Sequence, residues 1–151
     1  MTRLRSVPAY CSAFDEDDGT RKSPGASGYI TLGVDTYFFP IDAQDSLISS
    51  IHIQTDGTIA GTFSLEVCNM PYVDITDWDD SVSSPWVKYD ATTAYIPTNG
   101  TGWTVTNMTM VKTAGVGNAF VDLGNSGAAR LRLRADITTA GTVRVCQHGK
   151  D

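Results

Sequence analysis

The sequence predicts an all-β protein, an antiparallel β-sandwich or jelly roll of about eight strands. Apolar and polar residues alternate with a period of two in several runs, which is the pattern of a half-buried strand. These runs are short and are separated by glycine, proline, asparagine and aspartate, the residues that favour turns. Glycine, serine and threonine are abundant and no long window of good helix formers occurs, so helices are not expected.

The first 27 residues look irregular and are expected to form an extended arm, followed by one sandwich domain over residues 28–151. Proline and glycine interrupt this segment, which also carries an acidic run at residues 15–18. We expect the arm to lie against another chain rather than on its own sandwich. A total of 151 residues is enough for one domain with a single core.

In the first half of the domain, β-prone runs predict four strands, at residues 29–34, 37–41, 47–55 and 62–68. Pro40 marks the second run as an edge strand or as the end of a strand. In the third run Ile51 and Ile53 face inward, whereas His52 and Gln54 face outward. In the fourth run alternating phenylalanine, leucine and valine side chains face inward.

In the second half, further short strands are expected at residues 87–91, 94–96, 103–111 and 119–123. Asn99 and Gly100 form a strong turn signal. Trp103 alternates into a strand and is expected in the core. Trp78 and Trp86 flank an acidic loop outside any alternating run, so we expect them at an interface with another molecule.

Residues 129–148 predict a β-hairpin. Apolar residues alternate with charged ones along residues 130–137 and again along residues 143–145. Pairing the two apolar rows puts Ile137 opposite Val143. It leaves a three-residue loop that ends at Gly141, where such loops need a left-handed residue.

The same register places Asp136 opposite Arg144 as an ion pair and puts three arginines on one exposed face, two of them with no acid across from them. This arginine row is either a solvated charged face, which protects a sheet from aggregation, or a docking surface for carboxylates of a partner. The residues that we expect to contact a partner are Arg3, Arg5, Trp78, Trp86, Arg132, Arg134 and Arg144.

Charge and composition argue against several classes of function. A formal charge of −6 and a pI near 4.7 do not fit a general nucleic-acid binder, which needs a basic surface. No apolar leader follows Met1 and no run approaches the ~18 apolar residues of a membrane span, so we expect synthesis in the cytoplasm and no membrane partner. The three cysteines, at wide spacing, are expected to be free thiols.

No catalytic or metal-binding pattern is evident. The acidic run at residues 15–18 lacks the spacing of a calcium-binding EF-hand loop, and the acidic residues around Trp78 are equally unpatterned. We expect solvated loops or partner contacts there, with no metal and no cofactor. Neither His52 nor His148 lies in the context of a serine or cysteine nucleophile, and no facing pair of carboxylates for glycoside hydrolysis is discernible. We therefore do not expect an enzyme.

Two segments carry a resemblance to a known group of proteins. In residues 51–69, IHIQTDGTIAGTFSLEVCN, one strand is followed by a glycine-threonine-hydrophobic strand that ends in asparagine, and Trp86 lies in the loop beyond. In residues 129–145, an arginine-bearing strand turns through Gly141 and Thr142. This pattern resembles small jelly-roll proteins of tailed bacteriophage virions, above all the capsid decoration (cement) proteins. It covers roughly residues 45–147.

The resemblance implies a structural protein of the virion, made in the host cytoplasm and carried on the capsid surface. It would stabilise the shell by clamping adjacent subunits of the major capsid protein, as a homotrimer. An alternative from another class stays open, a carbohydrate- or receptor-binding module of a phage tail appendage. That module would use Trp78, Trp86 and the aromatic residues near them.

Overall fold

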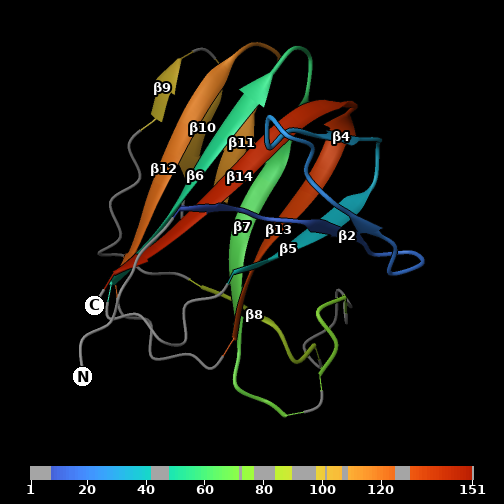
Figure 1. The fold of residues 1–151 in the computed structure, drawn as a ribbon, viewed down its shortest axis with the longest axis vertical. Coiled ribbons are helices and arrows are strands. Elements are labelled where there is room, and N and C mark those ends of the chain that lie inside the picture. The colour runs from blue at the N-terminus through green and yellow to red at the C-terminus, as the bar shows by residue number, and fades with distance from the viewer. Residues whose placement is uncertain are drawn as a thin grey trace.

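Two antiparallel β-sheets packed face to face make up the described part of this computed structural model (Figure 1). The residues that the structure describes are 8–41, 48–71, 73–76, 84–89, 98–100, 102–106, 109–124 and 130–150. Over these ranges the chain contains no helix long and apolar enough to cross a membrane.

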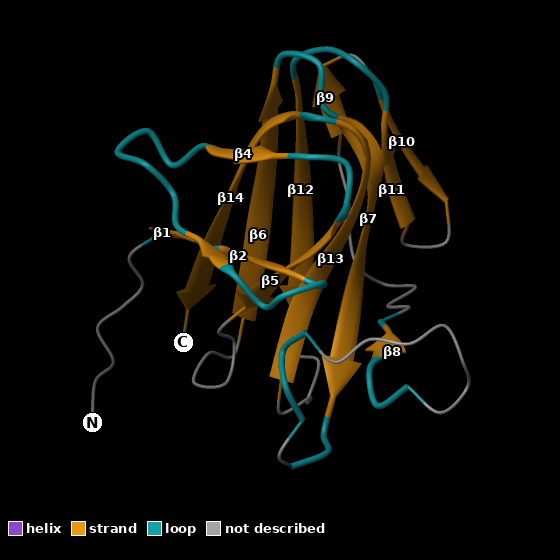
Figure 2. Ribbon diagram, turned by 90° about the vertical axis from the view of Figure 1, so that its right-hand side faces the viewer, coloured by secondary structure: helices purple, strands orange, loops and turns teal. Residues whose placement is uncertain are grey.

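Over these ranges, sheet A has six strands, β1 (Ala9–Tyr10), β4 (Ile30–Leu32), β6 (Ile48–Asp56), β9 (Thr98–Gly100), β12 (Gly117–Gly124) and β14 (Gly141–Lys150). Sheet B has eight strands, β2 (Ala13–Asp15), β3 (Arg21–Lys22), β5 (Thr36–Ile41), β7 (Ala60–Cys68), β8 (Val87–Lys88), β10 (Trp103–Thr106), β11 (Thr109–Lys112) and β13 (Arg130–Thr139). The side view separates the layer of β14, β6 and β12 from the layer of β13 and β7 (Figure 2).

Eight of the described strands form a jelly roll. Taken in chain order as β4, β5, β6, β7, β11, β12, β13 and β14, the first pairs with the eighth, the second with the seventh, the third with the sixth and the fourth with the fifth. Pairing of β6 with β14 and of β7 with β13 completes two four-stranded sheets. A long antiparallel hairpin rolled onto itself in this way has jelly-roll topology. The predicted fold class, a β-sandwich, is confirmed.

The alternation of apolar and polar residues positions the core as predicted. Ile51 and Ile53 of β6 are fully buried, whereas His52 between them is exposed. Trp103 is 7% exposed and packs against Phe63, with ring centroids 5.4 Å apart. Each strand presents one apolar face to the opposite sheet, and the apolar faces of the two sheets together form the core.

The predicted terminal hairpin is wrong, because β13 and β14 lie in different sheets. β13 pairs with β5 and β7, and its Ile137 lies opposite Gly61. β14 pairs with β1, β4 and β6, and its Val143 lies opposite Thr55 and Ile30. Two strands with one apolar face each satisfy the same pattern whether they pair edge to edge or stack face to face, and here their apolar rows share the core between the sheets.

The predicted roles of Gly141 and Asp136 are also corrected. Gly141 is not among the glycines with a left-handed backbone. A Cβ atom at Gly141 would lie 2.5 Å from the backbone nitrogen of Ile59, so glycine is required where the chain crosses closely between the sheets. Asp136 accepts a hydrogen bond from Thr36 Oγ1 at 2.7 Å and does not face Arg144, which belongs to the other sheet.

The segment predicted to be an arm belongs to the sandwich over residues 9–22. β1 pairs with β14 in sheet A, and β2 pairs with β5 in sheet B. Cys11 and Ala13 are buried, at 4% and 0% exposure. The edge strands offer unpaired backbone groups that this segment satisfies, so it crosses the side of the molecule from one sheet to the other (Figure 2). Residues 1–7 lie outside the described ranges.

Three further expectations fall in the second half. The single strand expected over residues 103–111 is a hairpin of β10 and β11. Asn99 and Gly100 lie in strand β9, and the positive φ of 90° belongs to Gly102, so the predicted turn at Asn99 is wrong. The strand expected at residues 94–96 falls outside the described residues.

Substitution of Gly141 by alanine tests the close crossing between the sheets. We expect Gly141→Ala to lower the free energy of unfolding by about 1–3 kcal/mol, because the added Cβ meets the backbone of Ile59. Gly25→Ala is the matched control, since the nearest atom there is the Tyr29 carbonyl oxygen at 4.0 Å. Urea denaturation followed by tryptophan fluorescence measures both, and equal stabilities would contradict the crossing.

Candidate binding face

The arginine row of β13 is covered by the protein's own chain. Arg132 has no exposed surface, and its guanidinium lies between two aromatic rings, 3.8 Å from the ring centroid of Phe38 and 4.2 Å from that of Trp86. The side chain projects from the outer face of sheet B, where the segment that carries Trp86 covers it. The prediction that Arg132 contacts a partner from an exposed face is therefore wrong.

Glu66 of β7 supplies the carboxylate that the sequence left unassigned. It lies directly across from Arg132, and Nε and Nη2 of Arg132 are each 2.7 Å from Glu66 Oε1. Arg132 Nη1 also donates a hydrogen bond to the carbonyl oxygen of Ile75 at 2.6 Å. Burial lowers the pKa of Arg132 below its ordinary value, and the charge of Glu66 opposes that shift. In the sequence, the one sign of this pairing is that Glu66 faces outward in its alternating run, as Arg132 does in its own.

The other two arginines of the row also make contacts within the chain. Arg134 Nε lies 3.2 Å from the carboxylate of Asp136, and Arg134 Nη1 lies 3.8 Å from Glu66 Oε2. Arg130 donates a hydrogen bond to the carbonyl oxygen of Val73 and lies over Trp86 at 5.2 Å. The contacts of Arg130 and Arg132 fasten residues 73–76 and the Trp86 segment onto sheet B.

Trp86 is part of this cover and is not at an exposed interface. It is 4% exposed, and its indole N–H donates a hydrogen bond to the carbonyl oxygen of Asp74 at 3.2 Å. The expected interface role of Trp86 is wrong, because stacking on two arginines buries the ring within the chain. Arg3, Arg5 and Trp78 lie outside the described residues.

Arg144 lies on the outer face of sheet A, away from the arginine row. Its Nε donates a hydrogen bond to Gln54 Oε1 at 2.7 Å, Nη2 donates to the same oxygen, and Nη1 donates to the carbonyl oxygen of Ser27 at 2.9 Å. The guanidinium stacks over Tyr29, 4.6 Å from the ring centroid. Of the five N–H groups of a guanidinium, three are used here and two remain. Among the described residues, no carboxylate pairs with Arg144.

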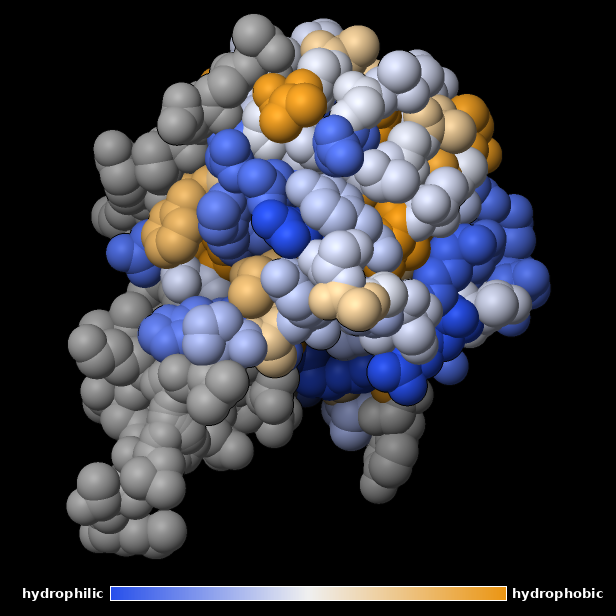
Figure 3. Space-filling model, turned by 45° about the horizontal axis from the view of Figure 1, so that its top comes forward, coloured by the Kyte–Doolittle hydropathy of each residue, from blue (hydrophilic) through white to orange (hydrophobic). Residues whose placement is uncertain are grey.

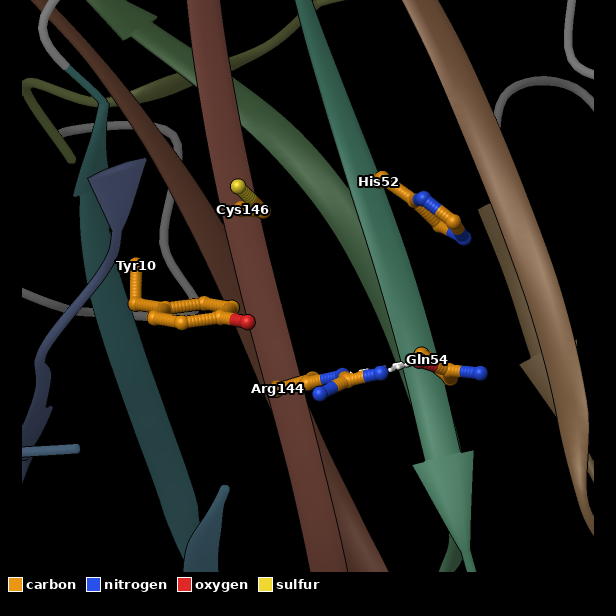
Figure 4. Close-up of a pocket in the computed structure, with 5 residues that line it drawn as sticks. All are labelled: Tyr10, His52, Gln54, Arg144 and Cys146. Carbon is orange, nitrogen blue, oxygen red and sulfur yellow. Dashed lines mark hydrogen bonds between the residues drawn. The ribbon is translucent and has the colours of Figure 1, made fainter. Parts of the chain in front are cut away.

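A hollow of about 170 Å³ lies beside Arg144 on this face and is lined by Tyr10, His52, Gln54, Arg144 and Cys146. These residues come from β1, β6 and β14, and the register places them side by side, with Tyr10 and His52 on either side of Cys146. Figure 4 shows Tyr10 reaching over β14, between Cys146 and Arg144, and Arg144 pointing to Gln54. The lining offers hydrogen-bonding groups on planar side chains and an aromatic ring.

Backbone and side-chain contacts hold the lining in place. Gly28 has a φ of 85°, and a Cβ there would lie 2.5 Å from the ring of Tyr10, so glycine lets this ring pack on the backbone. His52 Nε2 lies 2.9 Å from Asn118 Oδ1, and the edge of His52 meets Phe120 at a centroid distance of 6.3 Å. Tyr10 and Phe120 nevertheless stay 44% and 40% exposed.

All three cysteines are free thiols, as predicted. Cys11 and Cys68 are buried, and Cys146 is half-buried in the lining of the hollow. Burial raises the pKa of Cys11 to about 12 and also raises that of Cys146, where the charge of Arg144 opposes the shift. Neither environment favours the thiolate that a nucleophile needs.

An acidic cluster lies at one side of sheet B. Carboxylate oxygens of Asp15, Asp17 and Asp35 lie within 4.8 Å of one another. The pKa of Glu16 is raised, first by partial burial and then by these neighbouring charges. The side chains of Asp15 and Asp35 accept hydrogen bonds from backbone N–H groups nearby, as in ordinary acidic turns.

The surface facing the viewer in Figure 3 is mainly hydrophilic or neutral, with small, separate apolar patches. A broad apolar surface, which marks obligate protein interfaces, is not seen in this view. We take the outer face of sheet A, with the hollow at Arg144, as the candidate binding face.

Loss of Arg132 is expected to destabilise the domain itself. Arg132→Ala should lower the free energy of unfolding by about 3–5 kcal/mol, because it leaves Glu66 buried without its partner. The double variant Glu66→Leu with Arg132→Met should recover most of this loss, since apolar groups replace the pair. Denaturant titration checks both, and a loss below about 1 kcal/mol for Arg132→Ala would contradict the buried pair.

No family model matches the chain, and no curated protein matches it. Among solved structures, the chain is similar to the K1 cleaved adhesin domain of Lys-gingipain from Porphyromonas gingivalis W83. The TM-score is 0.45 and the sequence identity 8%, over 98% of this chain and 99% of that chain. A likeness at this level transfers nothing from that domain to the present protein.

Proposed function

We propose that the protein is a non-catalytic structural protein of a bacteriophage virion that decorates and stabilises the capsid. It binds the major capsid protein through the outer face of sheet A and bridges adjacent subunits as a homotrimer. The jelly-roll topology agrees with the resemblance to capsid decoration proteins, and a two-sheet sandwich supplies the rigid body that such a clamp needs.

The difference between the two outer faces carries this proposal. The outer face of sheet B is covered around Arg132 by the segment with Trp86, whose ring stacks on Arg130 and Arg132. The outer face of sheet A carries the exposed rings of Tyr10 and Phe120, and Tyr10 lies next to Arg144, which has two unused N–H groups. Exposed aromatic side chains next to an arginine are typical of protein contact surfaces.

The proposal moves the contact surface from Arg132, Arg134 and Trp86 to Arg144, Tyr10 and Phe120. Arg144 lies beside the open hollow and keeps two N–H groups for a ligand, whereas Arg132 has no exposed surface. The guanidinium of Arg144 can form charge-assisted hydrogen bonds with a carboxylate of a neighbouring capsid subunit.

A particle-stability experiment tests the capsid role. Particles with and without the protein are heated or pressurised, and shell rupture is followed by release of the packaged genome. We expect the protein to raise the rupture threshold at near one copy per capsid subunit, because a bound ligand stabilises the assembled state by mass action. The double variant Tyr10→Ala with Phe120→Ala should lose this effect while staying folded, since both rings are exposed. Val34→Ala, at another exposed apolar position, is the control and should keep the effect.

Equal rupture thresholds, with the protein found at a few copies on the tail, would reject the capsid role. That outcome would favour the second candidate, a carbohydrate- or receptor-binding module of a tail appendage. The observation that favours this candidate is the hollow of about 170 Å³, whose planar polar and aromatic lining fits one sugar unit better than a broad protein contact.

A further inference from the structure

The hollow on sheet A has the chemistry of a site for one particular class of ligand. We propose that it binds a glycan unit that carries a carboxylate on its sugar ring, with the carboxylate on Arg144. This inference rests on the second candidate function, and it names the ligand class of that site.

The charge of the residues that line the hollow favours an anionic ligand. Arg144 is the one permanently charged side chain of the lining, and the lining holds no carboxylate. The next outward position of β6 beyond Gln54 is Asp56, which lies outside the lining. The lining thus carries a local positive charge in a chain whose net charge is −6. A small anion is therefore the complementary group.

The guanidinium of Arg144 is held in a fixed position. Gln54 Oε1, the Ser27 carbonyl and the Tyr29 ring fix the guanidinium of Arg144 from three sides. The two N–H groups that remain lie on Nη1 and Nη2, one on each nitrogen. A guanidinium held in this way has little conformational entropy left to lose when a carboxylate binds.

The rest of the lining favours a carboxylate that is attached to a sugar over a simple carboxylate. The amide nitrogen of Gln54 points away from Arg144 and keeps its donors (Figure 4). Tyr10 contributes a hydroxyl group and a ring that is packed on Gly28, and His52 is the other ring-bearing residue of the lining. Planar polar groups around an exposed aromatic ring suit a ring with several hydroxyl groups and one apolar side.

Size agrees with a single bound unit. The hollow of about 170 Å³ lies below the roughly 300–1,000 Å³ of sites that enclose drug-sized ligands. It accommodates one sugar ring from the open side, and neighbouring units of a chain would run along the surface. Binding is expected to be weak for each unit and to gain from several copies of the protein.

Calorimetric titration with glycans of defined charge tests the proposal. The probes are oligogalacturonate, a hyaluronan oligosaccharide and sialyllactose, each compared with its methyl ester, which keeps the sugar and removes the charge. We expect at least one acid to bind and its ester to bind about 10-fold more weakly or worse, because the charge-assisted hydrogen bonds are lost. Raising the salt concentration should weaken binding of the acid.

Variants separate the site from general electrostatics. Arg144→Gln should weaken binding of the acid by about 10-fold or more, whereas Arg21→Gln should leave it unchanged. Arg21 is exposed and lies on sheet B, and its replacement by glutamine removes the same charge as Arg144→Gln does. The thermal unfolding midpoint of each variant is measured alongside, and Arg144→Lys, which keeps the charge but not the fork, should restore part of the affinity.

Three outcomes would overturn the inference: no binding of any of the three acids, equal binding of acid and ester, or equal binding of polyglutamate. The last would assign the hollow to a protein carboxylate. If Arg144→Gln abolished capsid stabilisation while no glycan bound, the capsid proposal would stand and this inference would fall. If glycans bound and rupture thresholds were equal, the reverse would hold.

Discussion

The burial of one positive charge governs the outer side of sheet B. A guanidinium without exposed surface must find a carboxylate and hydrogen-bond acceptors, and Arg132 finds them in Glu66 and the carbonyl of Ile75. Phe38 and Trp86 close over its two faces. The position of the Trp86 segment follows from this one side chain. So does the absence of an arginine docking surface at that point.

Alternation in the sequence was enough to predict which residues face the core, but not which strands pair. Ile51, Ile53 and Trp103 are buried as predicted. Ile137 and Val143 are buried as well, yet their strands belong to different sheets. A period of two fixes the side of a strand and leaves open whether its apolar partner lies beside it or across the core. Only long-range pairing decides between these arrangements.

The candidate site was less accessible to sequence reasoning than the fold. Arg144 was singled out, but with the wrong neighbours, because its partners Gln54 and Ser27 are 90 and 117 residues away in the chain. Tyr10 lies in the segment that the sequence predicts to be an arm. For His52 the sequence predicts only that the side chain faces outward. Each residue alone has an ordinary explanation. The register of β1, β14 and β6 is what brings them into one hollow.

The path of β1 and β2 from one sheet to the other has a consequence for how the molecule comes to be assembled. Tyr10 enters the hollow from an early strand, and Arg144 enters it from the last described strand. Contacts between segments so far apart close late, because the entropy of closing a long loop is lost before the contact stabilises anything. On a ribosome, the core strands of sheet B up to β11 would emerge well before β14 does. The hollow is then among the last features to form, and its integrity reports that the whole roll has closed.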